Sequence, residues 1–151
     1  EYVLGMILAQ LPGYIAAAWL VEKLGRKATL AGFIGMCAVS AYFFGQADSV
    51  AMIMFWGCLM SFFNLGAWGV LYTYTPEQYP TNIRAFGSGW ASAIGRMGGI
   101  VAPMVVTHMM VMQNGFSYVF MMFTAVLLAV ALVIVVLGEE TKGRTLESIG
   151  L

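Results

Sequence analysis

The sequence predicts an all-α integral membrane protein, a bundle of about five transmembrane helices. Hydrophobic residues make up 61% of the chain and charged residues only 9%, a balance typical of membrane proteins. The apolar residues fall in runs close to the ~20 residues that a helix needs to cross a bilayer. These runs lie near Tyr2 to Val21, Ala28 to Gly45, Val50 to Tyr74, Ala85 to Met112 and Phe116 to Leu137.

The basic residues predict how the spans are oriented. If the helices alternate in direction, six of the basic residues fall on one side of the membrane: Lys23, Arg26, Lys27, Arg84, Lys142 and Arg144. The turns on the other side, 46–49 and 113–115, contain no Lys or Arg. Because loops rich in Lys and Arg stay in the cytoplasm, we expect a multi-pass protein of the cell membrane. Its N-terminus would lie on the outer side and its C-terminus in the cytoplasm. Residues 1–138 would form the bundle and residues 139–151 a cytoplasmic tail.

The first two spans differ in their polar content. The first carries Gln10 and Pro12 near its middle, and proline weakens the helical hydrogen-bond ladder, which predicts a kink. Gln10 has two readings, a hydrogen bond to an adjacent helix or a contact with a ligand. The second span offers only small contact points such as Gly35 and Ser40, and we expect it to serve packing.

The third span places hydrogen-bonding groups beside large rings. Asn64, Trp68 and Tyr72 fall at helical spacing on one face. A mixed polar and aromatic face suits a small planar solute. Aromatic residues also gather at membrane interfaces, so Tyr72 has a second reading as an interfacial anchor. After this span, Pro76 and Pro80 are expected to end the helix and restart the chain.

Arg96 is the one basic residue deep inside an apolar span. A buried guanidinium is costly in hydrocarbon, so such groups usually face a bundle interior, a cavity or a partner. Small residues share its helical face: Gly89, Ser92, Ala93, Gly99 and Pro103. This stripe either lets another backbone approach closely or opens a polar hollow.

Depth along the helices brings these polar residues to one level. At ~1.5 Å per residue, Arg96 lies about 18 Å from Arg84, and Asn64 about 21 Å from Val50. Gln10 lies near the middle of the first span. We therefore predict a substrate site formed by Arg96, Trp68, Asn64 and Gln10, in which the guanidinium binds a carboxylate. The alternative is that Arg96 pairs with an acid outside this chain.

Three motifs carry a resemblance to the major facilitator superfamily. They are the loop AWLVEKLGRK, the loop TPEQYPTNIR and the tail GEETKGRTLESIGL. The first loop resembles the cytoplasmic loop signature of the whole superfamily. The second resembles a loop that sugar porters share with related metabolite transporters, and with its flanking residues it is most similar to the metabolite-proton symporters, which include carriers of nicotinate and hydroxybenzoates. The tail is similar to that of sugar porters. The resemblance implies two six-helix halves rocking about a central site. This chain looks like helices eight to twelve, so the N-terminal half would be missing and the chain a fragment.

The charged loops are expected to hold one access state of the transporter. Glu22, Arg26, Glu77 and Arg84 lie on the same predicted side of the membrane, where they would form an ion-pair network. Exposed pairs contribute little singly, so only a partly buried network would bias the conformational equilibrium. In the tail, a short amphipathic helix is expected from about Thr145 onward.

These observations favour secondary active transport of a small organic solute, an aromatic or other organic acid, with proton coupling implied by the resemblance. The alternatives are a sugar or organic cation transporter of the same superfamily, or a non-transporting membrane fragment or scaffold. One histidine, His108, two separated cysteines and no paired carboxylates at membrane depth disfavour an enzyme. We expect no cofactor. The basic residues form a membrane-edge belt, which disfavours nucleic-acid binding.

Overall fold

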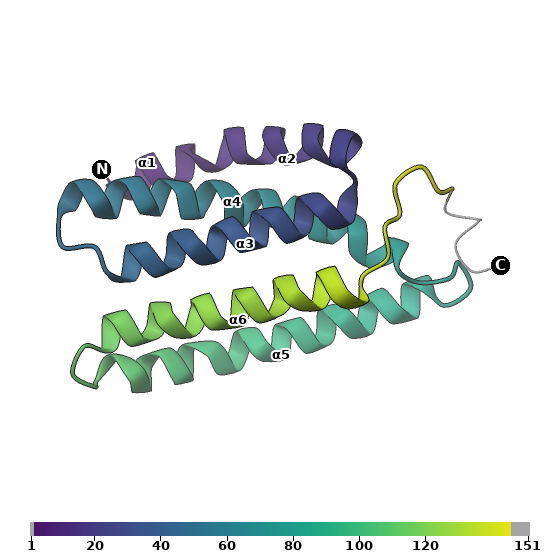
Figure 1. Ribbon diagram of the computed structural model, residues 1–151. Helices are drawn as coiled ribbons and strands as arrows, with labels where there is room; N and C mark the ends of the chain where they lie inside the picture. Colours follow the sequence, from purple (N-terminus) through teal and green to yellow (C-terminus); the bar gives the residue numbers. More distant parts are fainter. Residues whose placement is uncertain (1, 146–151) are drawn as a thin grey trace.

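The computed structural model describes residues 2–145, which form helices joined by short connections (Figure 1). The elements in order are α1 (Tyr2–Leu8), α2 (Gln10–Leu24), α3 (Arg26–Gly45), α4 (Val50–Glu77), α5 (Arg84–Met110) and α6 (Gly115–Leu137). Taking α1 and α2 together, five helices of the described chain are long and apolar enough to cross a membrane. The predicted number of spans and the all-α fold class are confirmed. The tail helix expected from Thr145 onward lies outside the described residues.

The first span is interrupted where the proline was expected to weaken it. Pro12 has no N–H to donate to the carbonyl of Leu8, and its ring crowds that carbonyl. The helix breaks at Ala9 and resumes at Gln10. Figure 1 shows α2 continuing in about the same direction as α1, so the feature is a break in the ladder with little bend.

The prediction that Pro76 ends the third span is wrong. Pro76 lies inside the last turn of α4, which ends at Glu77. A proline removes only its own hydrogen bond to the preceding turn, and here the helix continues for one residue beyond it. The chain leaves the helix before Pro80 and re-enters one at Arg84.

Helix α3 forms the centre of the bundle, as its plain sequence suggested. It packs against α4 on one side and α6 on the other, and Figure 1 shows it between these two helices. Leu30, Phe33 and Ile34 of α3 are buried together with Val70 and Tyr74 of α4. Phe33 also lies against the rings of Phe62 and Phe63 on α4. This core fixes α4 relative to α3.

Helices α2 and α4 approach each other to backbone contact at Gly13. A Cβ atom added at Gly13 would lie 2.2 Å from the carbonyl oxygen of Phe62. On α4, a Cβ added at Gly66 would lie 2.3 Å from the Phe33 ring and 3.0 Å from the carbonyl oxygen of Gly13. Only glycines permit this spacing, and it sets the side chains of α2 directly beside those of α4.

Helix α5 lies at the edge of the bundle beside α6 (Figure 1). It contacts α6 and α4, yet none of its residues is buried. The other described residues leave much of the side-chain surface of α5 uncovered. Most of the surface of α5 is therefore open to whatever surrounds this chain.

Candidate functional site

A hollow of about 400 Å³ lies between α2 and α4, and we call it the aromatic hollow. It is lined by Tyr14, Asn64, Leu65, Trp68, Gly69 and Tyr72. The rings of Trp68 and Tyr72 are 5.5 Å apart between centroids and inclined by 34°. Aromatic walls with a single amide group suit a flat solute that carries a few polar atoms.

Two of the four predicted substrate residues line this hollow. Asn64 and Trp68 come together because they are one helical turn apart on α4. Gln10 does not line it. Gln10 is partly buried, and within residues 2–145 its side chain makes no hydrogen bond to a neighbouring helix. Sequence reasoning left Tyr14 out of the site, although it lies one turn from Gln10 on the same face.

Arg96 lies on α5, away from the aromatic hollow. Its side chain is exposed, and no hydrogen bond or ion pair joins it to any other described residue. Its neighbours Gly89 and Gly99 also face open space, because a Cβ added at either would meet no atom within 4 Å. Within residues 2–145, the small-residue stripe therefore does not serve close helix packing.

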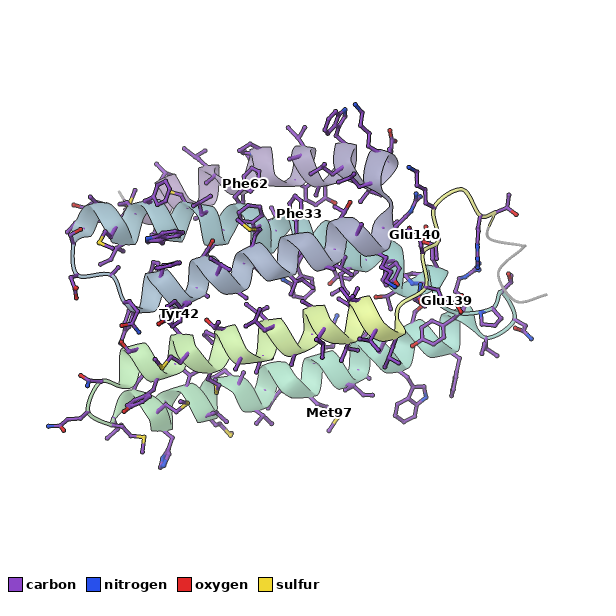
Figure 2. The ribbon with its side chains drawn as sticks, viewed as in Figure 1. Phe33, Tyr42, Phe62, Met97, Glu139 and Glu140 are labelled. Carbon is purple, nitrogen blue, oxygen red and sulfur yellow. The ribbon has the colours of Figure 1, made fainter. Side chains whose placement is uncertain are left out.

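The partly covered residues of α5 show which way Arg96 points. They are Arg84, Gly87, Ser88, Ala91, Val106 and Met109, and they recur at helical spacing on one face. At about 100° per residue, Arg96 lies about 120° round the helix from the centre of that face. Figure 2 shows the next residue, Met97, pointing away from the bundle. The guanidinium thus points outward from this chain.

A second constellation lies where the loops after α2, α4 and α6 meet, and we call it the charged end. Arg26 Nε lies 3.4 Å from Glu77 Oε2, with 26% and 13% of the two side chains exposed. The hydroxyl of Thr141, itself buried, donates a hydrogen bond to the same Glu77 oxygen. Arg26 and Glu77 were both predicted members of the ion-pair network, whereas Thr141 was not predicted.

The segment after α6 closes over the loop between α2 and α3. Glu140 accepts a hydrogen bond of 2.9 Å from the backbone N–H of Arg26. Its carboxylate lies 2.5 Å from where a Cβ of Gly25 would stand, and Gly25 has a φ of +96°. Figure 2 shows Glu140 beside this connection. Gly25 is therefore required both by its conformation and by the room that the carboxylate needs.

Further hydrogen bonds join the same segment to the end of α4. The hydroxyl of Tyr74 donates to the carbonyl of Glu139 at 2.8 Å. The Gln78 side chain donates to that carbonyl at 3.2 Å and accepts from the Glu139 N–H at 3.4 Å. The Lys142 ammonium donates to the carbonyl of Lys23. Residues 139–142 thus connect the two charged loops.

The other two predicted network members lie at the edges of the charged end. Arg84 Nε donates to the carbonyl of Pro76 at 3.0 Å, which ties the start of α5 to the end of α4. Glu22 is exposed, and its side chain makes no hydrogen bond or ion pair with another described residue. Within residues 2–145, no group of three His, Cys, Asp or Glu side chains is placed to share a metal ion.

The model of the family described as sugar (and other) transporter matches residues 4–150. The chain belongs to this transporter family. The match covers the aromatic hollow, α5 and the charged end. Together with the relatives below, it confirms the resemblance to the major facilitator superfamily.

Individual relatives of the transporter family are much longer than this chain. It is 83% identical over 151 residues to the niacin transporter NiaP of Acinetobacter baylyi, covering 100% of this chain and 34% of that protein. It is 57% identical over 148 residues to a Bacillus subtilis protein named "Putative niacin/nicotinamide transporter NiaP", covering 97% and 37%. The chain spans about a third of the length of these relatives.

Proposed function

We propose that this chain acts as part of a secondary transporter for a small aromatic acid of the nicotinate class. The support from relatives is the 83% identity to a protein named as a niacin transporter. The support from the structure is the aromatic hollow, in which the amide of Asn64 lies beside Trp68 and Tyr72. A flat heteroaromatic ring fits such walls better than a sugar, which needs many hydrogen-bonding groups.

Arg96 supplies the carboxylate recognition in this proposal. It is a permanent cation at the middle of a long apolar helix, with 12 residues before it and 14 after it in α5. A planar guanidinium binds a carboxylate through two hydrogen bonds. We propose that it faces the two thirds of the transporter that this chain does not contain. The substrate would then lie between this chain and that remainder.

The charged end acts as the conformational lock of the transporter. It faces the cytoplasm, by the placement of the basic residues, and residues 139–151 form the tail that follows the 1–138 bundle. The Arg26–Glu77 pair is partly buried and is supported by Thr141 and Glu140. A network of this kind favours the one access state in which the loops meet. Transport is coupled to protons and runs by alternating access.

The proposal is tested in a chimera. This chain replaces the matching segment of the A. baylyi relative, which supplies the remaining length, and uptake of labelled nicotinate is measured in cells lacking their own carrier. We expect saturable uptake that falls when the proton gradient is collapsed. Unlabelled benzoate should compete, whereas a hexose or a quaternary ammonium compound should not.

Each alternative function has its own outcome in this assay. Competition by a hexose or an organic cation, without competition by aromatic acids, would indicate another substrate class of the family. Normal membrane insertion with no uptake of any labelled solute would indicate a membrane scaffold. Either result contradicts the proposed substrate.

A further inference from the structure

The groove between α2 and α4 holds a second hollow, of about 240 Å³, on the side of the aromatic hollow nearest the charged end. Its lining includes Thr73 of α4, Glu22 of α2 and Arg26, the first residue of α3. We call it the charged-end hollow. Tyr14 and Gly69 line both hollows, so the two spaces meet at this pair of residues.

The Tyr14 ring lies on the bare backbone of Gly69. A Cβ added at Gly69 would lie 2.9 Å from Cε2 of Tyr14 and 3.3 Å from its Cζ. This contact follows from the close approach of α2 and α4 at Gly13, one residue before Tyr14. Tyr14 as a whole remains 52% exposed. The ring is therefore a wall with one face on α4 and the other free to contact a solute.

We propose that Tyr14, seated on Gly69, is a specificity-determining residue that closes the aromatic hollow toward the charged end and limits it to single-ring substrates. The inference rests on the proposed function for the substrate, and it adds a wall residue that the predicted site lacked. With the ring in place, Tyr14 and Gly69 form the boundary that the two hollows share. With the ring removed, we expect the two hollows to join into one larger space.

Gly69 acts through Tyr14. A methyl group at position 69 would come closer to the ring than carbon atoms normally approach, so the Tyr14 ring would have to move off α4. We expect the displaced ring to narrow the aromatic hollow and to weaken the binding of a six-membered ring there. The effect of Gly69→Ala should vanish when Tyr14 is already truncated, because two residues that act by one contact are not additive.

Inhibition constants measured in the chimera test this wall. We expect Tyr14→Ala to shift the ratio of the inhibition constants of quinoline-3-carboxylate and nicotinate by about tenfold in favour of the two-ring acid. We expect Gly69→Ala to raise the inhibition constant of nicotinate by about tenfold. Tyr14→Phe keeps the ring and should retain the native preference. Gly32→Ala is the matched control, because a Cβ at Gly32 meets nothing within 4 Å.

The two proposals fail separately in this experiment. In one outcome, the chimera carries nicotinate while Tyr14→Ala leaves the preference between one-ring and two-ring acids unchanged. In another, it carries nicotinate while Gly69→Ala weakens nicotinate binding equally with and without the Tyr14 ring. Either result overturns the proposed role of Tyr14 and leaves the proposed substrate standing. A chimera that carries another solute overturns the proposed substrate, and a size series of that solute then tests the wall by the same two variants.

Labelling chemistry gives a readout that needs no substrate. Asn64→Cys, in a background with Cys37→Ser and Cys58→Ser, places a thiol in the aromatic hollow. We expect Tyr14→Ala to speed its reaction with a bulky maleimide by about tenfold, while a small maleimide reacts at an unchanged rate. Equal acceleration of both reagents, or of neither, would overturn the wall.

Discussion

The carboxylate of Glu140 accepts a hydrogen bond from the backbone N–H of Arg26, 114 residues earlier in the chain, at 2.9 Å. Arg26 is the first residue of α3, and the first N–H groups of a helix have no partner within the helix. A negative charge at this position also suits the helix dipole. Glu140 therefore caps α3 from the far end of the sequence and holds the segment after α6 on the charged end.

Glu140→Gln should loosen this cap. A hydrogen bond to a charged group contributes about 1.5–3 kcal/mol, and the amide keeps only part of it. We expect the Arg26 amide to exchange its hydrogen about tenfold faster, measured by hydrogen exchange on the purified chimera. Glu139→Gln is the matched control, since the Glu139 carboxylate pairs only with an exposed Arg144 at 3.7 Å among the described residues. Equal exchange rates in the two variants would contradict the capping role.

Charge reversal should show that uptake depends on the ion pair between Arg26 and Glu77 and not on either charge alone. Arg26→Glu or Glu77→Arg alone places like charges together where the side chains are 26% and 13% exposed, and we expect uptake to fall about tenfold. The double reversal restores opposite charges and should recover much of the uptake. The same exchange at Glu139 and Arg144, which are 77% and 57% exposed, should change little. A double reversal no better than either single one would refute the pairing.

Gly13→Ala should destabilise the bundle. The added Cβ would meet the carbonyl of Phe62 at 2.2 Å, and because the opposing atom is backbone, α2 and α4 must move apart. Overpacking of this kind costs about 1–3 kcal/mol. Thermal unfolding in detergent should show a lower midpoint for Gly13→Ala, whereas Gly32→Ala, in open space, should not lower it. Equal midpoints would mean that the helices are not in backbone contact at Gly13.

The bundle was predictable because membrane spans are set by local composition. The runs of apolar residues gave five helices whose ends fall within a few residues of those observed. Pro76 was misread because a proline in the last turn costs only one hydrogen bond, which a helix tolerates. The kink predicted at Pro12 appears as a break between α1 and α2 with little bend.

Only the part of the site that lies on a single helix could be predicted from the sequence. Asn64 and Trp68 share a face of α4, and helical spacing alone brings them together. Tyr14 reaches them through the glycine contact between α2 and α4, which no local pattern reveals. Glu140 and Thr141 contact residues more than sixty positions earlier in the chain, which no local pattern predicts. The sequence did indicate that the tail could take part, because the charged loops and the charged tail were predicted on the same side of the membrane.

The role of Arg96 is the central claim, and a pair of solutes that differ only in charge tests it most directly. Nicotinate and nicotinamide share ring and size, so their relative inhibition constants in the chimera measure recognition of the carboxylate. We predict that the native sequence prefers nicotinate, that Arg96→Gln abolishes the preference, and that Arg96→Lys retains only part of it because an ammonium lacks the two-pronged geometry. An unchanged preference for nicotinate in Arg96→Gln would contradict the account.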